Sequence, residues 1–111
     1  MTTVTSRPLI LAKYAATTDT SEYTASNVRT IIDKFTAYNS DASARVLTLH
    51  LVPSGGTADA TNLIEATSIA AGATYSSPHV VGHTLENGGV LTVKADSASK
   101  VVVRATGREV S

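Results

Sequence analysis

The sequence predicts an all-β protein built as a single antiparallel β-sandwich, of the jelly-roll or immunoglobulin-like kind. Val, Thr, Ile and Tyr dominate its apolar segments, and these residue types suit a pleated, half-buried strand. The segments are short, and turns rich in glycine, serine and asparagine separate them, which is typical of sandwiches and barrels. A chain of 111 residues is long enough for one modest hydrophobic core, so we expect one domain.

The first predicted strand covers residues 9–15 and follows a polar segment. Residues 1–8, "MTTVTSRP", are polar, and the proline favours an extended backbone before it. We expect them to form an N-terminal arm outside a sandwich domain that spans residues 9–111. A plain frayed terminus is the alternative for this segment.

The segment "SNVRTIIDKF", residues 26–35, combines two conflicting signals. Its apolar residues, from Val28 to Phe35, recur at helical spacing. The β-branched run Thr30–Ile32 lowers helix propensity and favours a strand. We predict a strand here, with a short helix as the alternative, and we place Phe35 in the core.

The clearest alternation lies in "RVLTLHLV", residues 45–52, where the three leucines share one face. Residues 90–95, "VLTVKA", and 100–105, "KVVVRA", alternate in the same way. The short polar segment "DSAS" separates them, so we predict that they pair as an antiparallel hairpin. Further strands are expected at residues 62–69 and 80–85.

The stretch "HVVGHTLENGG", residues 79–89, raises the question of a metal site, because it holds two histidines four positions apart. On a helix they could share one ion, but Pro78, Gly82 and the valines between them argue against a helix. On a strand, residues four apart are separated by about 13 Å. One ion with bonds of about 2 Å cannot span that distance. We therefore expect rim histidines on a sheet and no metal site.

Other catalytic patterns are weak. The chain has no cysteine and no serine in a G-x-S-x-G turn. Its glycine-rich stretches, "PSGG" and "ENGG", do not open onto a predicted helix, so a phosphate cradle lacks its helix N-terminus. The candidate acid–base carboxylates, Glu65, Glu86 and Asp96, are scattered. We predict that the protein is not an enzyme and holds no cofactor.

Composition narrows the possible partners. Nine basic and nine acidic residues give a formal net charge of zero, which disfavours nucleic-acid binding. Only 16% of residues are charged, and such a surface favours association with other protein surfaces. The apolar run at residues 9–12 is too short for a signal peptide, and no stretch is long enough to span a membrane. We expect a protein made in a cytosol, without a membrane partner.

A carbohydrate- or receptor-binding module is the alternative from another functional class. Many such modules are small β-sandwiches that stack sugar rings on aromatic side chains. This chain has no tryptophan and only 5% aromatic residues. The residues that could contribute are Tyr14, Tyr23, Tyr38 and Tyr75, although a tyrosine on a small sheet more often serves packing.

The order of segments resembles that of small virion proteins of tailed bacteriophages. The similarity lies in the asparagine turn into a strand that ends in "VPSGG", the "IAAGATY" loop, and the later pattern L-x-x-G-x-x-L-x-V-K-A. It covers most of residues 28–107 and concerns strands and turns, with no chemical motif.

This resemblance implies a non-enzymatic structural protein that assembles on the particle in many copies, made in the bacterial host cytoplasm and localised to the virion. The role we expect first is that of a capsid decoration or cement protein, which binds the major capsid protein. We also expect copies of the chain to associate with one another. A tail, collar or head–tail component is the alternative. We expect contacts at the N-terminal arm and two loop tips. The candidate contact residues are Thr2, Thr3, Val4, Ser54, Gly55, Gly56, Thr57, Glu86, Asn87, Gly88 and Gly89.

Overall fold

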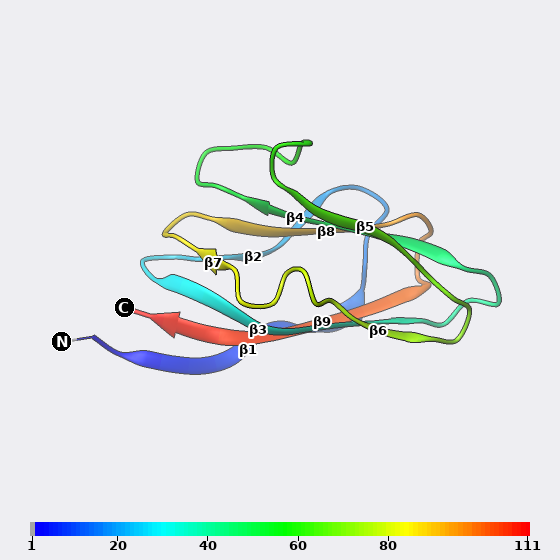
Figure 1. The fold of residues 1–111 in the computed structure, drawn as a ribbon, viewed down its shortest axis with the longest axis horizontal. Coiled ribbons are helices and arrows are strands. Elements are labelled where there is room, and N and C mark those ends of the chain that lie inside the picture. Colours follow the sequence, from blue (N-terminus) through cyan, green and yellow to red (C-terminus); the bar gives the residue numbers. More distant parts are fainter. Residues whose placement is uncertain (1) are drawn as a thin grey trace.

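Two antiparallel sheets pack face to face in the computed structural model, which describes residues 2–111 (Figure 1). Sheet A has the strand order β1-β9-β3-β6, and β7 also pairs with β3. Sheet B has the order β2-β8-β4-β5. The strands are β1 (Val4–Tyr14), β2 (Thr20–Thr24), β3 (Arg29–Asn39), β4 (Arg45–Val52), β5 (Leu63–Ile69), β6 (Thr74–Ser76), β7 (Thr84–Leu85), β8 (Val90–Ala95) and β9 (Val101–Val110). The predicted β-sandwich is confirmed.

The connections between the strands identify the sandwich as a jelly roll. Strand β6 pairs with Thr36–Tyr38 and β7 with Thr30–Ile31, both on β3 and opposite its other neighbour β9. The two pieces therefore act as one interrupted strand. Each sheet then has four strand positions, and every connection except β4–β5 crosses between the sheets. Two four-stranded sheets joined in this way form a jelly roll, whereas a seven-stranded immunoglobulin sandwich has a three-stranded sheet.

The core lies between the sheets and is made of apolar side chains from both. Phe35 and Ile32 of β3 are fully buried, as expected for Phe35, and they pack with leucines and valines of β4, β8 and β9. The segment over residues 26–35 is thus a strand, β3, and not a helix. It begins at Arg29, after Asn27 turns the chain with a φ of 59°.

The predicted hairpin of residues 90–95 and 100–105 is wrong. Both segments are strands, but β8 pairs with β2 and β4 in sheet B, and β9 pairs with β1 and β3 in sheet A. Residues 96–100 cross between the sheets, helped by Ser99 at a φ of 56°. Both strands carry buried residues at alternate positions, and these residues belong to the same hydrophobic core between the two sheets. The short segment between β8 and β9 therefore does not make these two strands pair with each other.

The predicted strand over residues 80–85 shrinks to two residues, Thr84 and Leu85. The chain loops before them so that Val80 is fully buried in the core. Gly82 has a φ of +90° and donates its N–H to the carbonyl of Ile32, which fastens this loop to β3. A regular strand cannot contain that backbone conformation.

The N-terminal boundary also differs from the predicted one at residue 8. Strand β1 begins at Val4, and residues 4–8 pair with β9 from Val110 to Thr106. Of the predicted arm, Met1 lies outside the described residues, and Thr3 exchanges backbone hydrogen bonds with Ser111. β1 forms the edge of sheet A, and Pro8 interrupts its register with β9.

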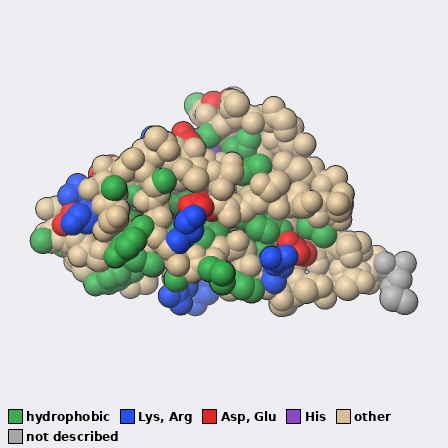
Figure 2. All heavy atoms as spheres, turned by 180° about the vertical axis from the view of Figure 1, so that it is seen from behind, with side chains coloured by type: hydrophobic (Ala, Val, Ile, Leu, Met, Phe, Trp, Pro, Cys, Tyr) green, Lys and Arg blue, Asp and Glu red, His purple; other side chains and the backbone are tan. Residues whose placement is uncertain are grey.

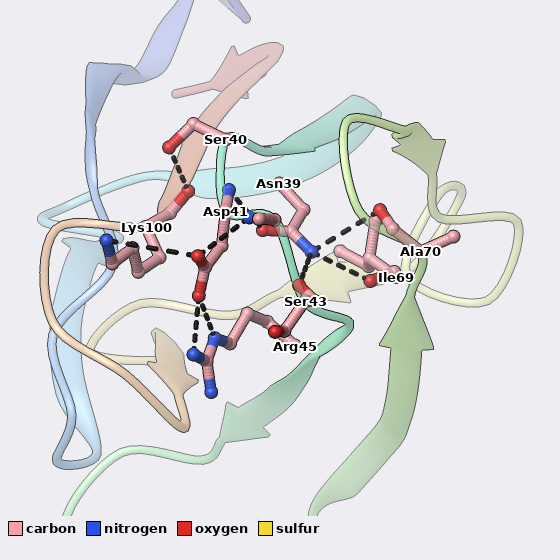
Figure 3. Close-up of polar contacts among 9 residues, drawn as sticks. Asn39, Ser40, Asp41, Ser43, Arg45, Ile69, Ala70 and Lys100 are labelled. Carbon is pink, nitrogen blue, oxygen red and sulfur yellow. Dashed lines mark hydrogen bonds and ion pairs between the residues drawn. The ribbon is translucent and has the colours of Figure 1, made fainter.

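A buried amide fastens the end of the sandwich at which β3 turns into β4 (Figure 3). Asn39 is fully buried, and its Nδ2 donates to the carbonyls of Ser43, Ile69 and Ala70 at 2.9, 2.9 and 3.3 Å. Its Oδ1 accepts from the Asp41 N–H at 2.9 Å. One side chain thus ties the β3–β4 turn to the end of β5.

Two tyrosines bridge the sheets along opposite edges. Tyr23 of β2 hydrogen-bonds Thr30 at 2.6 Å and also donates to Glu109 of β9. Tyr75 of β6 donates to Glu65 of β5 at 2.6 Å, and Ser77 donates to the other oxygen of that carboxylate. Burial and the adjacent carboxylate raise the pKa of both tyrosines, that of Tyr75 to about 12.

Candidate interaction surface

Three of the predicted contact segments meet at one end of the sandwich, although they are far apart in the sequence. Thr2, Glu86 and Asn87 line a single open hollow of about 510 Å³, together with Asn27, Val28, Arg29, Val110 and Ser111. The loop after β4 lies next to it, since Ser54 shares a smaller hollow of about 210 Å³ with Glu86 and Asn87. Figure 1 shows both chain ends and these turns at the same end of the two sheets. We call this surface the terminal surface and define it by the residues named here.

Two turns of the same kind support the terminal surface. In "PSGG" and "ENGG" the fourth residue donates its N–H to the carbonyl of the first, at 2.9 and 2.8 Å. The third residue, Gly55 or Gly88, has a positive φ of 78° or 88°, which glycine adopts without strain. A Cβ on Gly88 would lie 2.8 Å from the Cβ of Ser54. The absence of a side chain at Gly88 lets the two turns touch.

The turn at residues 86–89 is also bound to the chain before β3. Ala25 and the two glycines exchange backbone hydrogen bonds, from Gly88 N to Ala25 O at 2.7 Å and from Ala25 N to Gly89 O at 2.9 Å. The Asn27 N–H donates to Asn87 Oδ1 at 2.8 Å. Backbone bonds therefore fix this part of the surface independently of its exposed side chains.

Charge on the terminal surface is sparse and paired. Arg29 Nε lies 3.2 Å from Glu86 Oε2, and both side chains are well exposed, at 59% and 72%. Val28 and Val110 add apolar area between polar hydroxyl and amide groups. A shallow, nearly neutral surface of this composition suits contact with another protein surface better than it suits the binding of a highly charged ligand.

The predicted contact residues do not all serve this surface. Val4 is 58% exposed on the edge strand, where it pairs with Val110. Gly89 is buried. Gly56 packs against Val52 and Pro53, and Thr57 lines a separate hollow over the outer face of sheet B. Asn27–Arg29, Val110 and Ser111 also line the terminal surface, although the sequence did not predict them. Only the fold brings these residues beside the predicted turns.

The three histidines lie in two different environments. His79 and His83 are both exposed on the loop between β6 and β7. His50 is buried on β4, with Nδ1 3.7 Å from Asp19 Oδ1. Within residues 2–111, no group of three or more potential ligand side chains is arranged to hold an ion. The stretch "HVVGHTLENGG" contributes Val80 and Leu85 to the core and its final turn to the terminal surface.

Of the three carboxylates considered as acid–base candidates, Glu65 and Glu86 have other partners, and Asp96 is exposed directly after the end of β8. Glu65 accepts from Tyr75 and Ser77, and Glu86 pairs with Arg29. Asp41, at the opposite end, binds Arg45 at 2.5 Å, and this contact together with the Ala42 N–H lowers its pKa. The carboxylates of Glu65, Glu86 and Asp41 are thus each paired with a side chain that belongs to the fold.

Comparison with known proteins gave no match: no family model, no curated protein and no solved structure corresponds to this chain. Among residues 2–111 no helix has the length and apolar character needed to cross a membrane.

Proposed function

We propose that this protein is a non-enzymatic structural component of a tailed-bacteriophage particle, most specifically a capsid decoration or cement protein. In this role it would bind the major capsid protein through the terminal surface, in many copies and with contacts between copies. The observation that supports the proposal most is the meeting of both chain ends and two glycine turns on one nearly neutral surface. The jelly roll agrees with it by analogy, because viral capsid proteins and lectins both use this fold.

The test is the affinity of the protein for particles from which it has been removed. Arg29→Ala combined with Glu86→Ala truncates two exposed side chains of the terminal surface and leaves the backbone bonds beneath them in place. An exposed ion pair contributes about 0–1 kcal/mol to stability, so the fold should persist. We expect particle binding to weaken by about tenfold or more, which corresponds to about 1.4 kcal/mol.

The control is Asp33→Ala combined with Arg108→Ala, which removes a partly exposed ion pair, bidentate and with a shortest contact of 2.9 Å, from the outer face of sheet A. This variant should bind particles like the unchanged protein. Equal binding by both double variants would contradict docking through the terminal surface. Deleting residues 2–7 would be a poorer test, because it also removes four of the residue pairs between β1 and β9.

A tail, collar or head–tail component is the second candidate within the same class. The same surface would serve it, and the copy number per particle distinguishes the two. A carbohydrate-binding module remains the candidate from another class, and a specific observation favours it: Tyr14 and Tyr38 are 51% and 43% exposed.

A further inference from the structure

The outer face of sheet A carries a row of side chains that runs across four strands. Val102 of β9 pairs with Tyr14 of β1 on one side and with Tyr38 of β3 on the other, and Tyr38 pairs with Thr74 of β6. Residues paired in this way point to the same face of a sheet. The rings of Tyr14 and Tyr38 are therefore both presented to solvent, from backbone positions about 10 Å apart, which is two interstrand spacings.

Basic side chains lie beside this row. Along β3 and β9 the next pairs on the same face are Thr36 with Arg104 and Lys34 with Thr106. Two adjoining hollows of about 410 and 340 Å³ share Thr36 and Arg104 as lining residues, and Tyr38 and Lys34 line one each. Together they form a shallow groove over the β3–β9 pair that offers one aromatic ring, several hydroxyls and two cations.

The two cations of the groove have no acidic partner. Six Lys or Arg side chains lie within 4.0 Å of a carboxylate among residues 2–111, and neither Lys34 nor Arg104 is one of them. Asp33, the acid on the same strand, is engaged by Arg108 at 2.9 Å. In Figure 2 hydrophobic and basic side chains gather along the lower margin, where sheet A lies. The groove thus has an unbalanced positive charge in a molecule whose formal net charge is zero.

We propose that this groove binds an anionic saccharide, a chain of sugar rings that carry carboxylate or sulfate groups. Exposed tyrosine rings provide faces on which sugar rings stack. Threonine hydroxyls both donate and accept hydrogen bonds, and so match sugar hydroxyls. Arg104 and Lys34 pair with carboxylate or sulfate, the guanidinium in bidentate fashion. Among the residues that line the two hollows, Val102 is the one apolar side chain on this face besides the tyrosine ring, because Ala37 and Ala105 are core residues. This is a small apolar area for a protein partner.

The groove and the terminal surface occupy different parts of the molecule. Val102 and Val110 are at opposite ends of β9, about 26 Å apart at 3.3 Å per residue. A copy that docks through the terminal surface would leave the row of tyrosines free. The saccharide site is therefore independent of the proposed capsid contact, and either can fail without the other.

The test uses calorimetric titration of the whole protein with four polymers. Polygalacturonate carries carboxylates, heparin carries sulfates, dextran is neutral, and poly-L-glutamate is an acidic peptide. We expect binding to one or both anionic saccharides at least tenfold tighter than to dextran and to poly-L-glutamate. The two saccharide arms show which acidic group is preferred. No binding to either, or tighter binding to poly-L-glutamate, would overturn the assignment.

Variants locate the site. Tyr38→Ala and Arg104→Gln should each weaken saccharide binding by about tenfold, the scale of an interface residue that contributes about 1.4 kcal/mol. Tyr38→Phe retains the ring and should bind within about twofold of the unchanged protein. The matched controls are Lys94→Gln and Val46→Ala, a cation and an exposed apolar residue of sheet B. If the controls weaken binding as much as the groove variants, the groove is not the site.

Discussion

Replacing Asn39 with alanine is expected to lower the free energy of unfolding by about 3 kcal/mol, because it leaves buried backbone groups without partners. The two N–H groups of this amide serve three carbonyls, and its oxygen serves the N–H of Asp41. Alanine has no polar side-chain atom and so replaces none of these bonds. Denaturant unfolding of the variant, followed by fluorescence or circular dichroism, measures the loss.

Asn39→Asp separates the role of the amide from that of side-chain volume. Aspartate retains an acceptor for Asp41 N–H but turns an oxygen towards the carbonyls of Ser43, Ile69 and Ala70. It should therefore destabilise at least as much as alanine. Asn62→Ala is the control, because its amide bonds an exposed loop carbonyl, that of Thr57, and should cost below about 1 kcal/mol. Equal losses at positions 39 and 62 would contradict the role assigned to Asn39.

Stability should fall between pH 10 and pH 12 as the Tyr75 hydroxyl loses its proton. Burial and the Glu65 carboxylate raise the pKa of Tyr75 from 10.0 to about 12. The folded protein thus holds a proton that the unfolded chain has released in this pH range. The corresponding stabilisation is complete below pH 10 and disappears as pH rises through about 12. Two pKa units set an upper bound of about 2.7 kcal/mol, and solvent screening at this partly exposed ring makes the loss smaller.

The measurement is the urea midpoint at pH 9 and at pH 11 for the unchanged protein and for Tyr75→Phe. The phenylalanine variant cannot lose a proton at this position, so its midpoint should fall less between the two pH values. Tyr14→Phe is the control, since that ring is exposed and its hydroxyl makes no hydrogen bond within residues 2–111. If the urea midpoint falls equally in all three proteins between pH 9 and pH 11, Tyr75 does not cause the loss of stability at alkaline pH.

Local pattern was sufficient to identify most of the strands. The alternation of leucines in β4 and of valines in β8 and β9 reflects one face turned to the core, and that face is visible in sequence. The choice of strand partners is not local. The partners of β9 in sheet A are β1 and β3, which are distant from it in sequence, whereas its neighbour in sequence, β8, belongs to sheet B. A short polar connection suits a crossover between sheets as well as a hairpin.

The functional surfaces were predictable only in part. The turns at residues 53–56 and 86–89 follow from their glycines, but their contact through Ser54 and Gly88 depends on the whole fold. The four tyrosines look alike in sequence. Tyr23 turns inward at a bulge in β2, where its register with β8 shifts, whereas Tyr38 keeps the regular alternation of β3 and stays exposed. Bulges of this kind depend on the pairing of strands, so sequence periodicity does not reveal them.

In the proposed role the protein would act by contact with other virion proteins. The two glycine turns and the paired segments at the two chain ends are held by backbone hydrogen bonds, and exposed side chains lie around them. In the proposed role one end of the jelly roll would bind the particle and the outer face of sheet A would remain accessible. Both proposals rest on side chains that the core does not need, so each can be tested without unfolding the protein.

The measurement that most directly tests the central proposal is the copy number of this chain in particles purified from its source. Quantitative mass spectrometry against the major capsid protein supplies it. The account predicts a ratio near one per capsid subunit, or a simple fraction of one. A few copies per particle would contradict the decoration role and indicate the tail, collar or connector. Absence from purified particles would contradict the virion proposal altogether.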